Sequence, residues 1–215
     1  MTTLTQEKTL PKATAKRLPL YLRYLKMLQS DGVLRIKSHN FSEITQVPSA
    51  TIRRDFSYIG ELGRSGYGYE VDYLIERFSE FLKVEQPKNI AIIGCGNLGH
   101  ALIKNNFRRD KNLIISCVFD ANPQLIGQTI EGLLVQDIQD FPDFAQKNTI
   151  SLVISTVPSQ FAQEAIDIVT DSGVKAILNF APGRVRVPTD VHVQYIDLTS
   201  EVQTLLLYDE TIANF

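Results

Sequence analysis

The sequence has 215 residues, 44% of them hydrophobic and 21% charged, which is an ordinary composition for a globular protein and enough chain for two small domains. It contains no apolar run near the roughly 18 residues that a membrane helix needs, and its polar N-terminus lacks the apolar core of a signal peptide, so we expect a cytoplasmic protein without a membrane partner. The net charge of −2 divides unevenly, because residues 1–84 carry 13 of the 22 Lys and Arg but only 9 of the 24 Asp and Glu. A basic segment joined to an acidic one is typical of a phosphate-binding module attached to another domain.

An amphipathic helix is predicted near the N-terminus, after a polar tail over residues 1–10 that we expect to be disordered. Apolar side chains recur at helical spacing from Leu18 to Leu28. Pro19 fits the first turn of such a helix, where no backbone N–H is needed, and Gly32 ends it.

Two short helices joined by a tight turn are predicted next. The first covers residues 41–47 with a cap near Ser42, and the second covers residues 50–59 with Ser49 as its cap. The second helix is rich in Arg, Ser and Thr, so the pair predicts a helix-turn-helix whose second helix reads DNA.

The segment from Gly60 to Val71 predicts a wing after this recognition helix. Four of its twelve residues are glycine, and Tyr67, Tyr69 and Val71 alternate with them, which is typical of a β-hairpin. A further amphipathic helix is expected over residues 72–82, and the domain boundary near residues 85–88.

From Asn89 onward, apolar strands alternate with helices, which predicts a parallel sheet covered on both faces. Strands are expected over residues 90–93, 113–119, 150–155, 176–178 and 193–196, and helices from about 97 to 107 and from 162 to 170. The fold class is therefore α/β, with an N-terminal winged-helix domain (11–85), a Rossmann-type domain (86–198) and a C-terminal helix (199–215).

The pattern Gly94-x-Gly96-x-x-Gly99 carries the strongest chemical signal, because it follows an apolar strand and opens a helix. The three glycines respectively allow a tight turn, let the backbone approach a pyrophosphate, and permit close packing of helix on strand. Asp120 follows Gly99 by 21 residues at the end of the next strand, where an acid would hold the ribose hydroxyls of NAD and disfavour NADP. Cys95, Asn97 and Leu98 complete this candidate cofactor loop.

Two further turns stand at the carboxyl ends of predicted strands, where doubly wound sheets bind ligands. They are Thr156-Val157-Pro158 and Asn179-Phe180-Ala181-Pro182. Two interpretations of them stay open, as the lining of the nicotinamide half or as ordinary strand-to-helix turns. Cys95 likewise is either a reactive thiol at a helix N-terminus or a small residue that fills a tight turn.

The candidate DNA contacts lie on and beside the predicted recognition helix. They are Ser49, Thr51, Arg53, Arg54, Ser57, Tyr58, Arg64, Lys37 and His39. Arginine bonds a guanine edge or a phosphate, although each of these charges is also compatible with a solvated surface. Asp55 is better suited to orienting its neighbours than to reading bases.

No metal site is predicted, because Cys95 and Cys117 form no Cys-x-x-Cys pair and no histidine stands at ligand spacing from them. A disulfide bond between them would be unusual in a reducing cytosol.

Nine segments together carry a resemblance that runs from about Pro11 to the C-terminus. They are residues 14–23, 52–56, 63–71, 94–99, 119–120, 156–158, 162–163, 179–182 and 196–198. In this order they resemble the Rex family of bacterial redox-sensing transcriptional repressors. The chain departs from the family's usual pattern at Ser38–Ser42, at Gly183 and at the loop cysteine.

The resemblance implies a homodimer whose C-terminal helix, residues 199–215, is swapped onto the partner. It implies binding to a pseudo-palindromic double-stranded DNA operator without NADH, and release when NADH closes the dimer, with NAD+ as a weak competitor that favours the DNA-bound form. It also implies that Asp197 takes part in the switch near the nicotinamide, and that Arg17 links the DNA-binding domain to the partner subunit.

Three functions compete for this combination of modules. A repressor that senses NADH and NAD+ is favoured, since none of the three histidines, His39, His100 and His192, is an evident proton donor beside a hydride. We therefore expect no enzyme activity. The alternatives are an NAD-dependent oxidoreductase with an accessory nucleic-acid-binding domain, and a nucleotide-gated protein-interaction module.

Overall fold

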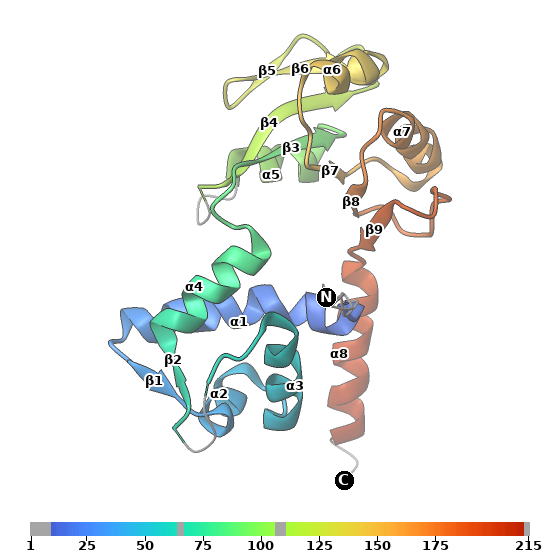
Figure 1. The fold of residues 1–215 in the computed structure, drawn as a ribbon. Helices are drawn as coiled ribbons and strands as arrows, with labels where there is room; N and C mark the ends of the chain where they lie inside the picture. Colours follow the sequence, from blue (N-terminus) through green and yellow to red (C-terminus); the bar gives the residue numbers. More distant parts are fainter. Residues whose placement is uncertain (1–9, 64–66, 106–110, 213–215) are drawn as a thin grey trace. The chain divides into compact units, whose positions relative to one another are not determined.

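The structure, a computed structural model, describes residues 10–63, 67–105 and 111–212, and the side chains of this range up to Leu207. The chain divides into two compact units, residues 1–86 and 87–215, which are described separately (Figure 1). Of the tail expected to be disordered, only Leu10 belongs to the described residues, and the predicted wing residue Arg64 lies outside them.

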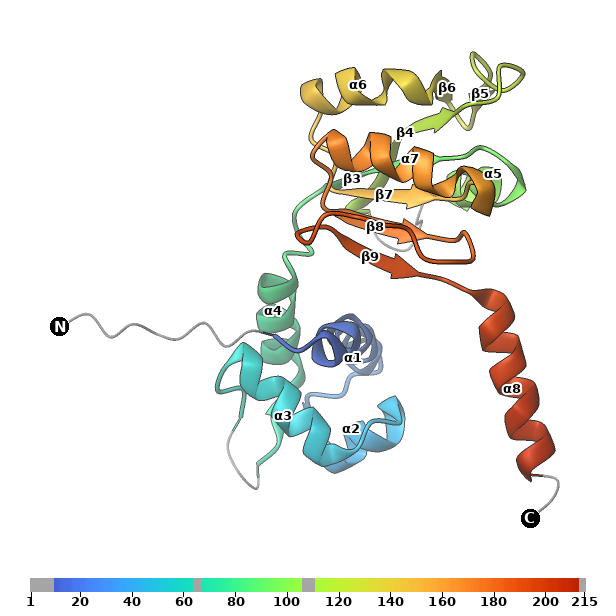
Figure 2. The same ribbon diagram turned by 90° about the vertical axis from the view of Figure 1, so that its right-hand side faces the viewer.

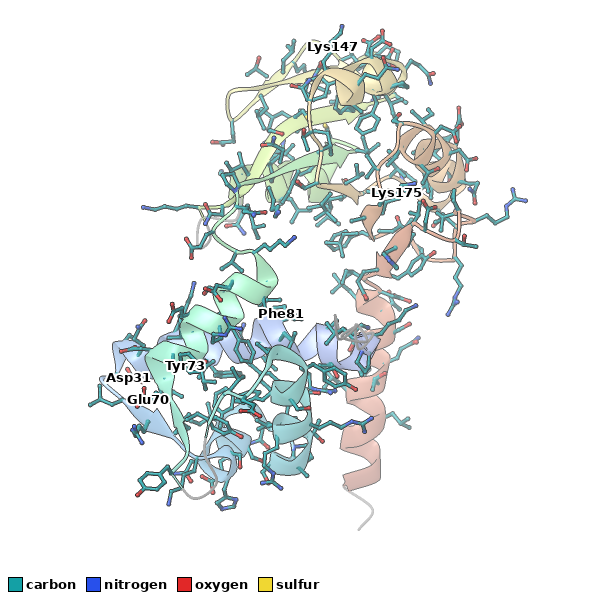
Figure 3. All side chains as sticks on the ribbon, viewed as in Figure 1. Asp31, Glu70, Tyr73, Phe81, Lys147 and Lys175 are labelled. Carbon is teal, nitrogen blue, oxygen red and sulfur yellow. The ribbon has the colours of Figure 1, made fainter. Side chains whose placement is uncertain are left out.

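The first unit contains four helices and two short strands among its described residues. They are α1 (Lys12–Ser30), β1 (Arg35–Ile36), α2 (Ser38–Thr45), α3 (Ser49–Ile59), β2 (Tyr69–Glu70) and α4 (Val71–Leu82). Their apolar faces enclose one core, at the centre of which the rings of Tyr21, Phe56 and Phe78 pack edge to face. Tyr73 and Phe81 lie on the exposed side of α4 (Figure 3).

The prediction that Pro19 lies in the first turn of its helix is wrong, because α1 begins at Lys12. The N–H of Ala15, four residues before Pro19, already donates to the carbonyl of Pro11 at 3.0 Å. An interior proline removes one backbone hydrogen bond. The first turns nevertheless form, because the side chains of Thr14 and Arg17 bind α3.

The two predicted serine caps are also wrong. Ser42 lies inside α2, which begins at Ser38, and Ser49 is the first residue of α3 rather than its cap. Lys37 and Pro48 occupy the N-cap positions with extended backbones and no side-chain cap hydrogen bond. Both helices therefore begin earlier than the capping preferences of serine indicate.

The predicted hairpin over residues 60–71 is not found within its described part. Instead, β2 pairs in an antiparallel manner with β1, which lies before α2, so that Arg35 stands opposite Glu70 and their side chains form an ion pair. A Cβ atom on Gly68 would lie 2.8 Å from the carbonyl oxygen of Ile36, so glycine lets the chain approach β1 closely.

The second unit contains a seven-stranded sheet. Its elements are β3 (Lys88–Ile93), α5 (Asn97–Asn105), β4 (Leu113–Asp120), β5 (Thr129–Ile130), β6 (Leu133–Asp137), the 3-10 helix η1 (Ile138–Asp140), α6 (Phe141–Lys147), β7 (Leu152–Ser155), α7 (Ser159–Asp171), β8 (Ala176–Asn179), β9 (His192–Tyr195) and α8 (Leu198–Ile212). The strand order is β5-β6-β4-β3-β7-β8-β9, and every neighbouring pair is parallel except β5 and β6. The chain moves outward from β3 to one edge and then returns to the other side of β3, as in a Rossmann fold.

Helices cover both faces of this sheet (Figure 2). Ala91 and Ile93 of β3 point into a core that α6 and α7 complete, whereas Ile90 and Ile92 point into a core that α5 completes. The alternation of side chains along one buried strand thus supplies both cores, which explains why its sequence is continuously apolar.

The last helix, α8, differs from the others in burial. All side chains described in it, from Leu198 to Leu207, are exposed, including Val202, Leu205 and Leu206. None of the helices in the described part of the chain is long and apolar enough to cross a membrane.

Candidate functional site

The glycine loop joins the end of β3 to the start of α5. Gly94 has φ +94°, a backbone conformation that side chains rarely allow, and Thr156 Oγ1 donates to its carbonyl oxygen at 2.6 Å. A Cβ atom on Gly99 would lie 2.0 Å from that same oxygen, so only glycine lets α5 pack this close. Nothing lies within 4 Å of a Cβ built on Gly96, whose backbone is open to a ligand. These three environments match the roles expected of the three glycines.

Asp120 ends β4 beside this loop. Its Oδ2 accepts the backbone N–H of Cys95 at 2.6 Å, and its Oδ1 accepts that of Asn122 at 2.8 Å. The two bonds fix the carboxylate, which is only partly buried, against the loop. Because a carboxylate has about four lone-pair sites, it can still accept hydroxyl groups of a ligand.

A cavity of about 710 Å³ opens at the carboxyl ends of β3, β4 and β7, where the strand order reverses. Its volume lies within the range of small-molecule and cofactor sites. The predicted residues that line it are Gly94, Gly96, Asn97, Asp120, Thr156, Val157 and Pro158. Cys95, Leu98 and Gly99 belong to the loop but are not among its lining residues.

The remaining lining residues were not predicted from the sequence. They are Ile93, Ala121, Asn122, Leu125, Ile138, Gln139, Phe161, Glu164, Ala165 and Ile168. The last four recur at the spacing of one face of α7, which is a signal that the sequence does contain. Phe161 is 53% exposed and gives this face a large apolar surface toward the cavity.

Of the residues predicted near the nicotinamide, Thr156, Val157 and Pro158 line this cavity, whereas the turn from Asn179 to Pro182 and Asp197 do not. Asn179 is fully buried at the end of β8, and its side chain bonds the backbone N–H of Ala181 at 3.3 Å. Asp197 immediately precedes α8, where its Oδ1 accepts the N–H groups of Thr199 and Ser200 and its Oδ2 accepts the hydroxyl of Ser200 at 2.6 Å. These bonds, the Ser200 hydroxyl first, hold the pKa of Asp197 below its usual value. In the single chain Asp197 is thus a helix cap.

The loop cysteine has the environment of a packing residue. Cys95 is 4% exposed, and its Sγ lies 3.7 Å from the carbonyl oxygen of Phe119. Burial and the neighbouring carboxylate of Asp120 raise the pKa of this thiol to about 12. A protonated, inaccessible thiol is a poor nucleophile, so the geometry favours the structural interpretation over a reactive one.

The candidate DNA contacts gather on α3 and at the start of α2. Arg53, Arg54 and Ser57 are exposed, and Ser49, Thr51 and Tyr58 are half-buried on the same helix, with Lys37 and His39 exposed at α2. Arg53 Nη1 donates to Ser38 Oγ at 3.2 Å, which places the exposed side of α3 beside the start of α2. The surface therefore combines an arginine-bearing helix with a helix N-terminus, both of which suit phosphate contacts.

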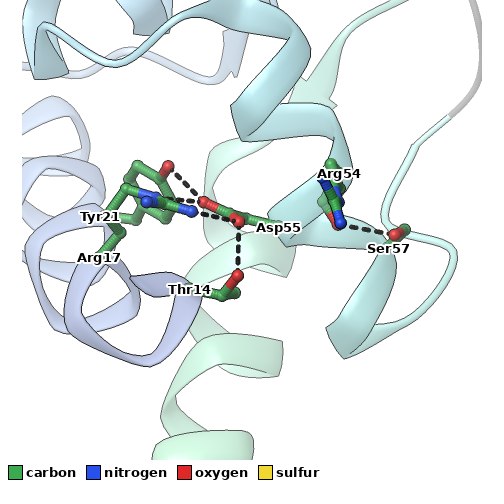
Figure 4. A network of polar contacts seen from close by, with 6 residues as sticks. All are labelled: Thr14, Arg17, Tyr21, Arg54, Asp55 and Ser57. Atoms are coloured by element: carbon green, nitrogen blue, oxygen red, sulfur yellow. Dashed lines mark hydrogen bonds and ion pairs between the residues drawn. The ribbon is translucent and has the colours of Figure 1, made fainter. Parts of the chain in front are cut away.

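Asp55 lies on the buried side of α3, and Arg17 of α1 binds it (Figure 4). Arg17 Nε donates to Oδ2 at 2.6 Å and Nη2 donates to Oδ1 at 2.8 Å. In the single chain Arg17 is therefore engaged within its own unit, and Asp55, at 1% exposed, is not on the open side of α3.

Comparison with known proteins follows the same division of the chain. Residues 9–57 match the family described as "Putative DNA-binding protein N-terminus", and residues 85–183 match "CoA binding domain". The chain is 62% identical over 207 residues to the redox-sensing transcriptional repressor Rex 2 of Enterococcus faecalis, which covers 96% of both chains. The chain belongs to the Rex family. It is also 52% identical over 206 residues to the Rex repressor of Latilactobacillus sakei, covering 96% of this chain and 99% of that one.

Solved structures of a Rex-family repressor, RSP, have the same fold. RSP in complex with β-NAD+ and operator DNA is 35% identical, covers 95% of each chain and superposes with a TM-score of 0.86. RSP in complex with β-NADH is 32% identical, covers 96% of this chain and 98% of that one, and has a TM-score of 0.84. Together with family membership, these matches confirm the predicted α/β fold and a redox-sensing repressor rather than an enzyme.

A metal centre has no support in the described ranges of this Rex-family chain. No three His, Cys, Asp or Glu side chains in them gather as metal ligands do.

Proposed function

We propose that this chain binds a pseudo-palindromic operator as a cytoplasmic homodimer and leaves it when NADH binds. The proposal rests on one observation: a dinucleotide-sized cavity with a fixed acid at its glycine loop shares a chain with an exposed, arginine-bearing helix. RSP, which is similar over 95% of this chain, was solved with β-NAD+ and operator DNA and also with β-NADH. Both ligands therefore fit the family fold to which this chain belongs.

In this proposal the glycine loop and Asp120 bind different parts of the dinucleotide. The open backbone at Gly96 and the N-terminus of α5 receive the pyrophosphate, because the first N–H groups of a helix have no intrahelical partner. Asp120 accepts the ribose hydroxyls and repels the additional phosphate of NADP. The apolar side chains of Leu125, Ile138 and Phe161 provide a surface on which a base can stack.

The contacts that discriminate between NADH and NAD+ must lie at the nicotinamide ring. The two ligands differ there by one charge and by ring planarity, and a ligand shifts an equilibrium only by the difference in its affinity for the two states. We assign this contact to Asp197 and to the turn from Asn179 to Pro182. Because Asp197 also caps α8, a ligand that engages its carboxylate competes with the start of that helix. If the variant Asp197→Ala keeps the NADH/NAD+ affinity ratio of the wild type in titration calorimetry, this assignment is wrong.

The exposed apolar face of α8 supports the proposed homodimer. Leu198, Val202 and Leu205 recur at helical spacing and are 65%, 54% and 68% exposed, so this helix buries no apolar stripe in its own chain. An equivalent helix of a second copy supplies the same surface by symmetry, as the swapped helix of the family implies. The side of Arg17 that Asp55 does not cover remains available for the interdomain contact that the family assigns to it.

The operator is identified by selecting duplexes from a random-sequence library with the full-length chain. We expect enrichment of a pseudo-palindrome, because two symmetry-related recognition helices read two half-sites. Recovery of duplexes without a shared sequence would contradict the proposed function.

A further inference from the structure

We propose that Asp55 is the positioning residue of the recognition helix, because it fixes the rotation with which α3 presents Arg53 and Arg54 to DNA. The inference deepens the proposed function and depends on it, since it assumes that α3 reads the operator.

The carboxylate of Asp55 accepts four hydrogen bonds, all from side chains of α1 (Figure 4). Oδ1 accepts from Thr14 Oγ1 at 2.9 Å and from Arg17 Nη2 at 2.8 Å. Oδ2 accepts from Arg17 Nε at 2.6 Å and from Tyr21 Oη at 2.8 Å. Three side chains spaced along α1 thus converge with four donor atoms on a single carboxylate of α3.

The network lies largely inside the core. Asp55 is 1% exposed, Tyr21 is fully buried and Thr14 is 3% exposed, whereas Arg17 reaches the surface with 26% of its side chain exposed. Burying an ion pair is costly, and an apolar pair of similar size is often as stable. Stability alone therefore does not explain a carboxylate here. A fully bonded polar network instead allows one arrangement of the two helices, because its bonds are directional.

Apolar contacts constrain α3 less than this network does. Ile52, Phe56 and Ile59 share the buried face with Asp55, and their burial is driven by a non-directional effect, whereas hydrogen bonds depend on angle. A rotation of α3 by about 20° would move side-chain ends by about 2 Å, given a helix radius of about 5–6 Å. Hydrogen bonds to a base edge tolerate only a few tenths of an ångström, so such a rotation abolishes them.

The direction in which DNA affinity changes when Asp55 is replaced distinguishes a positioning role from a purely electrostatic one. Asp55 places a negative charge on the helix that carries Arg53 and Arg54, so its removal would strengthen DNA binding if charge alone mattered. The positioning role requires the opposite, a loss of operator affinity. If Asp55 contributes only to stability, operator affinity should not change in either direction, provided that the variant is folded at the temperature of the assay.

The test compares Asp55→Asn with Glu80→Gln by fluorescence anisotropy on the selected operator and on an unrelated duplex of equal length. Glu80→Gln removes the same charge from the exposed Arg77–Glu80 pair of α4 and is the matched control. We expect Asp55→Asn to weaken operator binding by at least about tenfold, which is the size of one lost bidentate base contact. Binding to the unrelated duplex should not weaken. The control keeps its preference for the operator.

NADH affinity provides an independent readout, because the cavity belongs to the other unit, and it should remain unchanged in Asp55→Asn. Tyr21→Phe keeps the ring in the core and removes one donor, so we expect a smaller loss of the same kind. Operator binding that is unchanged or tighter in folded Asp55→Asn overturns the proposal. If that variant does not fold, an unchanged operator preference in Tyr21→Phe overturns it. A wild-type chain that selects no operator contradicts the proposed function instead.

Discussion

At the residue scale, Asp120 is held in place by its own chain before a ligand arrives. Backbone N–H groups on the glycine loop and on the turn after β4 both bind its carboxylate, which lowers the entropic cost of ordering it for the proposed ribose contact. This preorganisation is specific to an acid at this site, since an amide or an alanine does not accept both bonds and the ribose hydroxyls.

The variant Asp120→Ala is therefore expected to bind NADH at least about tenfold more weakly, as loss of a charge-assisted hydrogen bond implies. Its operator affinity without NADH should be that of the wild type. Calorimetry with NADH measures the first quantity. Asp171→Ala, which removes an exposed carboxylate from the end of α7, is the control and should bind NADH normally. Equal NADH affinity in both variants would exclude the ribose role.

Asp55 should contribute to the loss of folding stability at acidic pH. Burial opposes its charge, but the hydrogen bonds from Arg17, Tyr21 and Thr14 outweigh this effect, and the pKa lies below its usual value. A lowered folded-state pKa contributes stability above the unfolded value of about 3.9, and this contribution disappears as the pH falls through the folded value. Urea unfolding between about pH 2 and 6 should show this loss in the wild type and a flatter profile in Asp55→Asn. Parallel profiles would contradict the account.

At the element scale, Gly96 and Gly99 are three residues apart, yet we expect their substitution to affect different properties, ligand binding and folding respectively. Gly99→Ala places a Cβ atom against the carbonyl oxygen of Gly94, and backbone cannot move aside as a side chain does. We expect a loss of at least about 2 kcal/mol in the free energy of unfolding, as for other overpacked sites. Gly96→Ala meets open space and should unfold like the wild type, yet bind NADH weakly, because its methyl group occupies the approach to the pyrophosphate. Denaturant melts and NADH titration of both variants check this, and reversed phenotypes would contradict it.

The elements that could be predicted are those with a strong local pattern. The buried strands β3, β4 and β7 have continuous apolar runs, and the glycine loop and Asp120 are fixed by spacing along the chain. The sheet edge formed by β5 and β6 was not predicted, because β5 has only two residues and Leu134 of β6 is 55% exposed. The pairing of β1 with β2 was missed because the two strands are separated by α2 and α3.

The site was predictable to the same extent and for the same reason. Gly94, Asp120 and Thr156 follow strands directly, so their meeting at one sheet edge follows from parallel topology. Ile138 and Phe161 reach the cavity from η1 and α7; the spacing along α7 marks one face of that helix, but that this face lines the cavity follows from its packing on the sheet. Pro19 is an example of a local preference that fails: proline favours the first turn of a helix, but side-chain contacts of Thr14 and Arg17 extend α1 before it.

At the scale of the whole molecule, the exposed stripe of α8 predicts the assembly. A charge at Leu205 places a carboxylate in the centre of this stripe, whereas Gln203 lies away from it on the same helix. Leu205→Asp should therefore be monomeric in light scattering and bind the operator weakly, since one recognition helix reads only a half-site. Gln203→Asp should remain dimeric. A monomeric wild-type chain with full operator affinity would contradict the homodimer.

The central claim is that NADH and operator DNA exclude each other on this chain, and such coupling must be reciprocal. The most direct measurement is fluorescence anisotropy of the selected operator with the wild-type chain, repeated with saturating NADH and with saturating NAD+. Operator affinity should fall by about 5- to 150-fold with NADH, the range of ordinary allosteric coupling, and should be retained with NAD+. An operator affinity that stays the same while calorimetry shows NADH to be bound would contradict the account.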